Sequence, residues 1–532
     1  MSHRTEQLTS YPAISKPRRV YMLLSGPLTH GAAGLANSVI ARASALARAG
    51  KSVTILVDVW QPDLESHVES LIKSGRLCST VDVRNMYSDL AAAKDSPQNF
   101  DSLDLGRPAI SDYTADMTSK VDSNDGRIIR FYFNGQYTYF GYKSDGYVVA
   151  FLDELVGGAR TRRLYFDTSG KLVRATSFDK DEVAVDEVYN SNGIVYSKVE
   201  HNRAQKESTI LVRSGSSEYR QLVSGETLLT HWLVECFDLG PDDFLISEYA
   251  FKFDALVEVT RKTQVPVVYT LHNSHLGPPY SAGAPLKPEF EVTFQNAPNM
   301  DALVVLTTQQ KFDIVKRYPA LKNVYSIPHA TPQPFASVSP PPPEREAGLI
   351  VLVGRLTEIK GQCRAVETFS RVLDMHPDSK MELWGRGEDE ARISRLISDL
   401  GLQERVVLKG FTKDTSEVYE RAEIALFPSH YEGQPLSLLE AMRAGCVPVS
   451  YDFKYGARMI IDDLRNGVLV DRGDDEDLMD SVSALLSDRK SLRSMSDSAR
   501  DKSTKFSTDR LVRDWDALFS SVAANRTSGG SK

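Results

Sequence analysis

Apolar and polar positions in the first eighty residues follow the order strand, turn, helix, strand. The runs "RVYMLLSG" and "SVTILVDV" are almost continuously apolar, which is typical of strands buried on both faces. Between them, "LANSVIARASALARAG" repeats apolar residues at helical spacing and ends at Gly50. The pattern predicts a βαβ unit within residues 1–80, the beginning of a parallel sheet.

The pattern changes over residues 81–220. The segment "RIIRFYFNGQYTYFGYKSDGYVVAFLDEL" alternates aromatic and polar residues and carries the turn pairs Asn134-Gly135 and Asp145-Gly146. Such alternation predicts an antiparallel β module inserted into the α/β domain. The α/β pattern resumes over residues 221–330, with predicted strands in "DDFLISE", "VPVVYTLHNSH" and "DALVVLT".

A proline-rich stretch, residues 331–347, precedes the second half and predicts a semi-rigid linker. Residues 348–505 then repeat short apolar runs, most of them separated by helical segments, which predicts a second doubly wound sheet. The six runs are "LIVLVGRL", "KMELWGRG", "RVVLKGF", "EIALFPS", "CVPVSYD" and "NGVLVD". The last segment, residues 506–532, is expected to be a helix with a flexible tail, "RTSGGSK".

Composition narrows the class of protein. A chain of 532 residues is long enough for two or three domains, and 41% hydrophobic with 25% charged residues is typical of a folded globular protein. The net charge of −8 argues against a dedicated nucleic-acid-binding protein. The first apolar run is too short for a signal peptide or a membrane span, so we expect a cytoplasmic protein, with peripheral membrane contact left open. Neither a zinc site nor a disulfide framework is indicated by the scattered cysteines, Cys78, Cys236, Cys363 and Cys446.

Two glutamates in "SHYEGQPLSLLEAMRAGCVPV" suggest a ligand site. Pro435 suits the first position of a helix and Gly445 the position after its end. The helix N-terminus would offer free N–H groups to a phosphate or a sugar. Glu432 would lie at that end, and Glu440, inside the helix, would accept hydrogen bonds from a diol. The alternative is that Glu432 only complements the helix dipole and Glu440 is a solvated helix residue.

Cations and glycines follow other strands of the same predicted sheet. Arg355 and Lys360 lie in "VGRLTEIKG", and two cations at a βα turn suit a diphosphate, although isolated surface charge is the alternative. Gly385 and Gly387 end another strand in "WGRGEDE". Because loops at the carboxyl ends of parallel strands share one edge of the sheet, these features predict a single ligand site there.

With these motifs in place, the second half resembles the retaining glycosyltransferases of the GT-B type, the large family-four group. The resemblance rests on "GRLTEIKG", "WGRGEDE", "LKGFT", "FPSHYEGQPLSLLEAMRAGCVPV" and "NGVLV". "YDFKYGARMIIDD", "LHNSHL", "LTTQQ" and the β insert are similar to a narrower set, the wall teichoic acid glycosyltransferases and the accessory-secretion enzymes that add N-acetylglucosamine to serine-rich adhesins. The implied fold class is α/β, with two facing doubly wound Rossmann-like domains and an antiparallel β insert in the first.

The resemblance implies roles for individual residues. Arg355 and Lys360 would hold the diphosphate of a UDP-sugar, Glu440 the ribose hydroxyls, and Glu432 would face the donor sugar. His272 would lie near the transferred sugar; His275 is its rival, and Asn273 and Gln310 are weaker candidates. The implied catalytic set is Glu432, His272, Arg355 and Lys360. Further implied donor-binding positions are Gly26, Gly31, Gly385, Phe411, Thr412, Gly433 and Leu436.

The implied reaction transfers glucose or N-acetylglucosamine from a UDP-sugar to a hydroxyl group, with retention of configuration. No metal is expected, because "DDED" at residues 474–477 reads as a helix start. Two departures concern the donor sugar: Gln434 stands where many relatives have phenylalanine, and "YGA" follows Lys454 where Tyr-Gly-Pro is usual. The alternatives are a non-catalytic chaperone of this fold and an epimerase, which the long insert argues against.

The acceptor is the substrate that the sequence determines least. The resemblance implies a cell-wall polymer or a serine-rich protein, and it implies that the insert binds the acceptor or mediates homo-oligomerisation. The basic stretch "ARTRR", residues 159–163, is a candidate patch for a polyanionic polymer; a solvated loop is the alternative.

Overall fold

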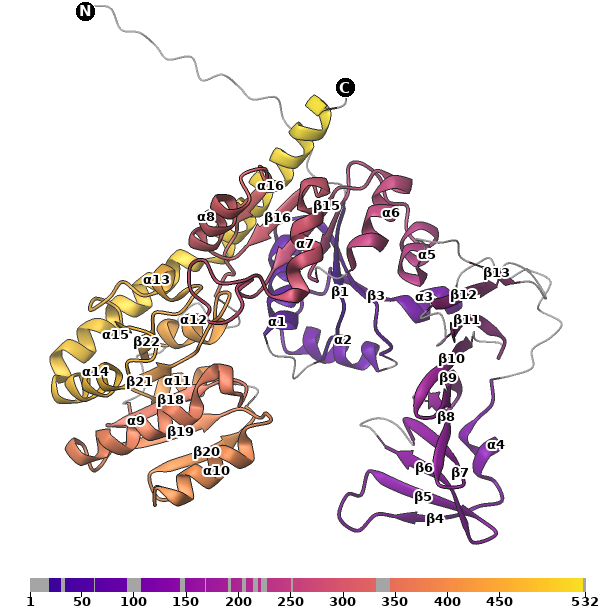
Figure 1. Ribbon diagram of the computed structural model, residues 1–532, viewed down its shortest axis with the longest axis horizontal. Coiled ribbons are helices and arrows are strands. Elements are labelled where there is room, and N and C mark those ends of the chain that lie inside the picture. The colour runs from indigo at the N-terminus through magenta and orange to yellow at the C-terminus, as the bar shows by residue number, and fades with distance from the viewer. Residues whose placement is uncertain are drawn as a thin grey trace, which may run out of the picture.

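The computed structural model describes residues 19–29, 34–61, 63–92, 107–143, 149–167, 169–189, 193–202, 207–213, 219–221, 227–249, 252–331, 345–412 and 414–529. It contains two α/β lobes that lie against each other and a third sheet that extends from the first lobe (Figure 1). This is the predicted fold class. Within the described ranges, no helix is long and apolar enough to cross a membrane.

The N-terminal lobe is built on a seven-stranded parallel sheet of order β17-β16-β15-β14-β1-β2-β3. Its strands are β1 (Arg19–Leu24), β2 (Ser52–Val57), β3 (Asp82–Asn85), β14 (Phe244–Ser247), β15 (Val267–Leu271), β16 (Ala302–Val305) and β17 (Val324–Ser326). Its main helices are α1 (Leu35–Arg48), α2 (Leu64–Lys73), α5 (Leu228–Glu235), α6 (Phe253–Thr263), α7 (Glu291–Asn296) and α8 (Thr308–Arg317). Alternate residues of β1 belong to separate apolar cores on the two faces of the sheet, which is why its sequence is continuously apolar.

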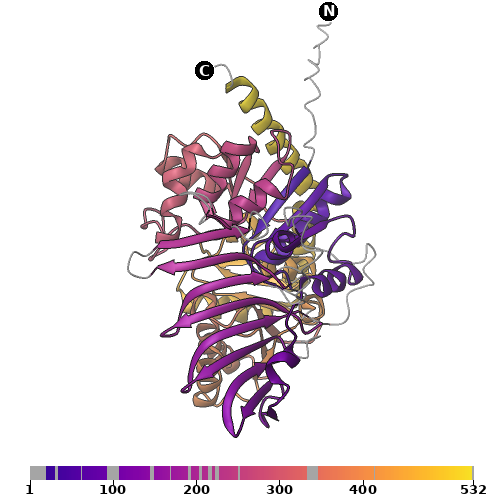
Figure 2. The same ribbon diagram turned by 90° about the vertical axis from the view of Figure 1, so that its right-hand side faces the viewer.

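The insert is a ten-stranded antiparallel meander in which every strand pairs with its neighbours in sequence (Figure 2). Helices α3 (Met86–Ala92) and α4 (Ile110–Thr114) precede it. Its strands are β4 (Thr118–Val121), β5 (Ile128–Phe133), β6 (Gln136–Tyr142), β7 (Phe151–Val156), β8 (Ala159–Phe166), β9 (Leu172–Asp179), β10 (Glu182–Tyr189), β11 (Val195–Asn202), β12 (Glu207–Arg213) and β13 (Tyr219–Gln221). Asn134 and Gly135 both have positive φ, 48° and 80°, as their predicted hairpin requires. The other predicted turn, Asp145-Gly146, lies outside the described residues.

The basic stretch "ARTRR" belongs to strand β8. Arg163 forms an ion pair with Asp153, with 2.6 Å between Nε and Oδ1, and Arg162 lies 3.6 Å from Glu187. The guanidinium of Arg160 lies 4.0 Å from the centre of the Phe178 ring. The stretch is therefore not a solvated loop, and two of its three positive charges face carboxylates, Asp153 of β7 and Glu187 of β10.

The C-terminal lobe has a six-stranded parallel sheet of order β20-β19-β18-β21-β22-β23. The six predicted apolar runs form these strands: β18 (Leu349–Val353), β19 (Lys380–Trp384), β20 (Val406–Gly410), β21 (Ile424–Phe427), β22 (Val447–Tyr451) and β23 (Val468–Val470). Helices α9 (Gln362–Met375), α10 (Glu390–Asp399), α11 (Thr415–Arg421), α12 (Leu436–Arg443), α13 (Ala457–Ile460), α14 (Asp475–Ser487) and α15 (Arg489–Ser503) connect and cover them. Most of the proline-rich linker, residues 332–344, lies outside the described part of the chain.

The last helix, α16 (Thr508–Gly529), leaves the C-terminal lobe and packs on the N-terminal lobe (Figure 1). Its apolar face joins the core beneath α1 through Leu511, Trp515, Leu518, Phe519 and Val522. Arg526 forms an ion pair with Asp301, with 2.5 Å between Nε and Oδ1. The predicted flexible tail is thus wrong from residue 526 to residue 529, because the helix continues along a surface that the sequence pattern did not reveal.

Candidate active site

The C-terminal lobe has its topological switch point between β18 and β21, where the strand order reverses direction. Ligands of such sheets bind in the crevice outside the carboxyl ends of the strands at this point. The loop after β18 carries Arg355 and Lys360, and the loop after β21 carries Glu432. Lys360 Nζ lies 2.5 Å from Glu432 Oε1, so the structure brings these two predicted residues into direct contact. Arg355 is exposed on the same loop as Lys360.

The loop after β19 packs tightly against the loop that carries Arg355. Gly385 has φ of 145°, and a Cβ atom at this position would lie 1.8 Å from the carbonyl oxygen of Gly354. Lys360 lies beside Gly354 in turn, since a Cβ there would be 3.6 Å from Lys360 Cε. Gly385 therefore allows the close approach that positions the two cations, and its N–H donates to the carbonyl oxygen of Gly410, at the end of β20, at 2.8 Å.

The predicted nucleoside end of the site follows β20. Phe411 is 46% exposed, and Thr412 follows it at the same edge of the sheet. Glu440, on α12, accepts a hydrogen bond from the Thr415 hydroxyl at 3.0 Å. Burial raises the pKa of Glu440, while Thr415 and Arg76 of the opposite lobe act against that shift. Glu440 is consequently neither a solvated helix residue nor remote from the site.

Helix α12 begins one residue later than predicted. Pro435 has ψ of 113° and is the N-cap residue, so Leu436 is the first helical residue. No side chain of the described residues caps this end, which leaves its N–H groups available to a ligand. Gly445, with φ of 73°, follows the helix as expected.

The N-terminal lobe presents its own switch point, between β1 and β14. Gly26 is the second residue after β1, and a Cβ atom there would be 3.4 Å from the Tyr249 hydroxyl. Ser25 donates a hydrogen bond to Asp58 at 2.8 Å, and Gln61 exchanges two hydrogen bonds with the backbone of Leu28, which hold the start of the glycine loop. Gly31, the other predicted residue of this loop, lies outside the described residues.

The structure separates the two histidine candidates. His272 is 14% exposed, and its Nε2 lies 2.6 Å from Glu248 Oε2. His275 is 1% exposed and stacks on Tyr455 with 5.7 Å between ring centres. The Gln310 side chain binds the backbone here: its amide donates a hydrogen bond to the carbonyl oxygen of Asn273 at 2.9 Å. The geometry favours His272 as the histidine that faces the site, and His275 and Gln310 as packing residues.

The two lobes touch directly at these residues. A Cβ atom on Gly433 would lie 2.1 Å from the carbonyl oxygen of His272, so the loop of Glu432 rests against the end of β15. The Gln434 side chain accepts from the backbone N–H of His329 at 2.6 Å and donates to its carbonyl oxygen at 3.2 Å. Gln434 thus joins the two lobes. The sequence showed only that glutamine stands here in place of the usual phenylalanine, and it did not predict this contact.

Known proteins resemble this chain in sequence and in fold. Residues 339–502 match the family described as Glycosyl transferases group 1. The second lobe is a group 1 glycosyl transferase domain. Over 247 residues, the chain is 30% identical to the poly(glycerol-phosphate) alpha-glucosyltransferase of Bacillus subtilis (strain 168), a match over 46% of this chain and 36% of that relative. The chain therefore spans about a third of the length of this relative.

Other relatives match over their full length. The poly(ribitol-phosphate) alpha-N-acetylglucosaminyltransferase of Staphylococcus aureus (strain COL) is 22% identical over 511 residues, 95% of this chain and 100% of that one. A mutant of S. aureus TarM, solved with fondaparinux, alpha-GlcNAc-glycerol and UDP, has a TM-score of 0.78 at 20% identity, over 94% of this chain and 99% of that one. The pneumococcal O-GlcNAc transferase GtfA, solved with UDP and GlcNAc, has a TM-score of 0.76 at 16% identity, over 95% and 99%. These likenesses confirm the GT-B fold.

The group 1 domain also inserts a side chain into the opposite lobe. Tyr455 donates a hydrogen bond to Asp313 of α8 at 2.9 Å, and Lys454 Nζ lies 2.5 Å from the same carboxylate oxygen. The Tyr455 side chain is buried against Leu276 and Ala284 of the N-terminal lobe. The sequence "YGA", which replaces the usual Tyr-Gly-Pro, therefore lies in a contact between the lobes.

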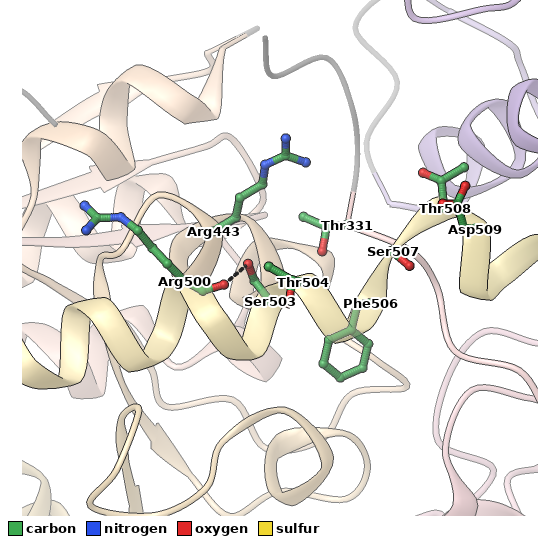
Figure 3. Close-up of a pocket in the computed structure, with 9 residues that line it drawn as sticks. All are labelled: Thr331, Arg443, Arg500, Ser503, Thr504, Phe506, Ser507, Thr508 and Asp509. Atoms are coloured by element: carbon green, nitrogen blue, oxygen red, sulfur yellow. Dashed lines mark hydrogen bonds between the residues drawn. The ribbon is translucent and has the colours of Figure 1, made fainter. Parts of the chain in front are cut away.

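A separate pocket of about 410 Å³ lies where the chain crosses from α15 to α16 (Figure 3). It is lined by Thr331, Arg443, Arg500, Ser503, Thr504, Phe506, Ser507, Thr508 and Asp509. Arg443 is the last residue of α12, whose first turn lies at the candidate active site. This pocket is at the other end of that helix, and none of the predicted donor-binding residues lines it.

Metal ligation has no visible basis in the part of the chain that the structure describes. No group of three or more histidine, cysteine or acidic side chains gathers there in a way that could hold a metal ion. The residues Asp475–Asp477 form the first turn of α14, with Asp474 as the N-cap. Independence from metal stays a prediction, tested below with a chelator.

His275 predicts a pH dependence of stability. Burial lowers the pKa of His275 to about 4 from an ordinary value of 6.5. Between these pH values the unfolded chain binds a proton at His275 that the native protein does not. The contribution of the neutral, buried ring to the free energy of unfolding is therefore present above pH 6.5 and is lost as the pH falls toward 4. At pH 5 the loss is about 2 kcal/mol. We expect the apparent melting temperature of the wild type to fall more between pH 7.5 and pH 5 than that of His275→Gln.

The matched control for this prediction is His67→Gln, which removes a half-buried histidine of α2 far from the lobe contact. It should keep the pH dependence of the wild type. Equal pH dependence in all three proteins would contradict the assignment.

Proposed function

We propose that this protein is a retaining glycosyltransferase that moves glucose or N-acetylglucosamine from a UDP-sugar to a hydroxyl group of a cell-wall polymer or a serine-rich protein. One observation carries the proposal: Lys360 and Glu432 meet at the switch point of the group 1 domain, opposite His272 of the other lobe. The named activities of the relatives, which concern poly(glycerol-phosphate), poly(ribitol-phosphate) and a peptide, agree with it. A polymer acceptor would place the enzyme in the cytoplasm, at the inner face of the membrane.

In the proposed reaction, the bond between the sugar C1 and the oxygen of the UDP β-phosphate breaks, and the acceptor oxygen bonds to C1 on the same face. Negative charge builds on the leaving phosphate, where Arg355, Lys360 and the first N–H groups of α12 would stabilise it. The leaving phosphate takes the proton of the acceptor hydroxyl. Glu432 would hold the donor sugar and Glu440 the ribose, while Phe411 would lie against the base.

The second candidate function is a non-catalytic sugar-binding chaperone. A crystal structure of a GtfA/B complex shares the fold, with a TM-score of 0.70, so a protein of this architecture does assemble with another chain. The presence of Arg355, Lys360, Glu432 and Glu440 together favours the enzyme.

The test is the release of UDP from UDP-glucose and from UDP-N-acetylglucosamine by the wild-type protein, with and without a chelator. Poly(glycerol phosphate), poly(ribitol phosphate) and a serine-rich peptide would serve as acceptors. We expect turnover of one donor that the chelator does not reduce. Binding of UDP without turnover of either donor would favour the chaperone, and loss of turnover in the chelator would overturn metal independence.

A further inference from the structure

Glu248 is a buried carboxylate at the switch point of the N-terminal lobe. It directly follows β14, the strand next to β1 in the sheet, and its side chain is inaccessible to solvent. A buried carboxylate is costly unless it is paired and hydrogen-bonded. Glu248 has two partners: Arg42 of α1 donates to Oε1, and the ring of His272 contacts Oε2 at 2.6 Å.

The pair with Arg42 keeps this carboxylate charged. Burial alone would raise the pKa of Glu248, but Arg42 and His272 outweigh burial and lower it. An ionised carboxylate only accepts hydrogen bonds, so Nε2 of His272 must carry the hydrogen that it donates to Oε2. Burial also lowers the pKa of His272, which makes the ring neutral near pH 7. The other nitrogen, Nδ1, then has a free lone pair.

Nδ1 of His272 is left without a partner. It is buried and has no hydrogen-bond partner among the described residues. The ring cannot turn freely, because His329 stacks on it with 5.4 Å between ring centres and an angle of 10°, and Gln434 of the opposite lobe holds the backbone of His329. Nε of Arg42 is a second buried atom of this cluster without a partner. Nδ1 differs from it in being an acceptor, so it points to a ligand that donates a hydrogen bond.

We propose that Glu248, held by Arg42, is a positioning residue that fixes His272 as the Nε2–H tautomer, so that Nδ1 accepts a hydrogen bond from a hydroxyl group of the bound donor sugar. This inference rests on the proposed function. It assigns no proton transfer to His272, and Glu248 itself does not touch the sugar.

The same chain of contacts reaches the C-terminal helix. The guanidinium of Arg42 is covered by the Trp515 ring of α16, with 4.9 Å to the ring centre. Arg42 is 2% exposed and Trp515 is 1% exposed. The helix that crosses from the group 1 domain therefore completes the burial of the ion pair that orients His272.

The first test reads the tautomer without any assay of activity. In protein labelled with ¹⁵N-histidine, a long-range ¹H–¹⁵N spectrum distinguishes the nitrogen that carries hydrogen from the bare one, and the signals lost in His272→Asn identify His272. We expect hydrogen on Nε2 and a bare Nδ1 in the wild type. Hydrogen on Nδ1, or on both nitrogens at pH 7.5, would overturn the proposal, and this result does not require the variant to be active.

The second test is a double-mutant cycle on donor hydrolysis. Glu248→Gln can donate to Nε2 and so allows the other tautomer; we expect kcat/KM to fall about tenfold, the value of one hydrogen bond. His272→Asn places an amide near the position of Nδ1 without using Glu248, so in that background Glu248→Gln should have little further effect. Additive losses would contradict a role through His272.

The control is Asp243→Asn. Asp243 is 1% exposed and pairs with Arg19 at 2.8 Å, but it lies at the opposite end of β14, away from the site. It should lower stability and leave kcat/KM and the His272 signals unchanged. If the wild type hydrolyses neither donor, the proposed function fails, and the tautomer is still decided by the spectrum.

Discussion

Replacement of Lys360 by alanine is expected to lower kcat for donor hydrolysis by about 10²–10³-fold, equivalent to about 3–4 kcal/mol. Lys360 is the cation at the switch point of the group 1 domain, and its Nζ lies 2.5 Å from Glu432. Without it, negative charge on the leaving phosphate loses one stabilising partner and meets the unpaired carboxylate of Glu432. The measurement is the rate of UDP release at saturating donor.

The matched control is Lys502→Ala. Lys502 belongs to the same lobe and also forms a partly buried ion pair, 2.6 Å from Asp462, but it lies on α15. We expect it to retain the wild-type rate. A Lys360→Ala rate within threefold of the Lys502→Ala rate would remove Lys360 from the site.

Replacement of Gly433 by alanine should lower kcat/KM about a hundredfold with little change in the stability of either lobe. A Cβ atom there would lie 2.1 Å from the carbonyl oxygen of His272, far closer than non-bonded atoms allow. The neighbouring backbone belongs to the other lobe, so the lobes must separate by an ångström or more. A displacement of about 1 Å in an active site can cost about 10²-fold in rate.

The control is Gly240→Ala, in the N-terminal lobe, where a Cβ atom would meet no other atom within 4 Å. Small-angle scattering of Gly433→Ala should show a more open arrangement of the lobes than in wild type and Gly240→Ala. Full activity of Gly433→Ala would show that the lobe contact at His272 is not needed for turnover.

Several elements were predicted directly from the sequence. The six apolar runs of the second half became β18 to β23, because strands buried on both faces must be continuously apolar. Arg355, Lys360 and Glu432 were expected on neighbouring strand-end loops, and the sheet order places them there. Their roles toward a donor stay predictions until the variants are measured.

Other features of the site left only a weak signal in the sequence. Glu248 is visible at the end of "DDFLISE", where an acidic residue follows a buried strand, but nothing local shows that Arg42 and His272 converge on it. Gln434 was noticed only as a departure from phenylalanine, and its partner, His329, is 105 residues away. Asp313 and Tyr455 are similarly distant in sequence.

The sequence by itself determined the two parallel sheets, the antiparallel insert and the strand-end loops of the second lobe, because these depend on periodicity and on turn residues that act over a few positions. Only the tertiary structure decided how the lobes meet: the crossing of α16, the fit of Gly433 against His272, and the buried Arg42–Glu248–His272 chain. These contacts depend on shape and charge between separate segments, which in the buried chain are 24 residues apart for Glu248 and His272 and 206 for Arg42 and Glu248. The local sequence pattern does not show which other segment a residue will contact.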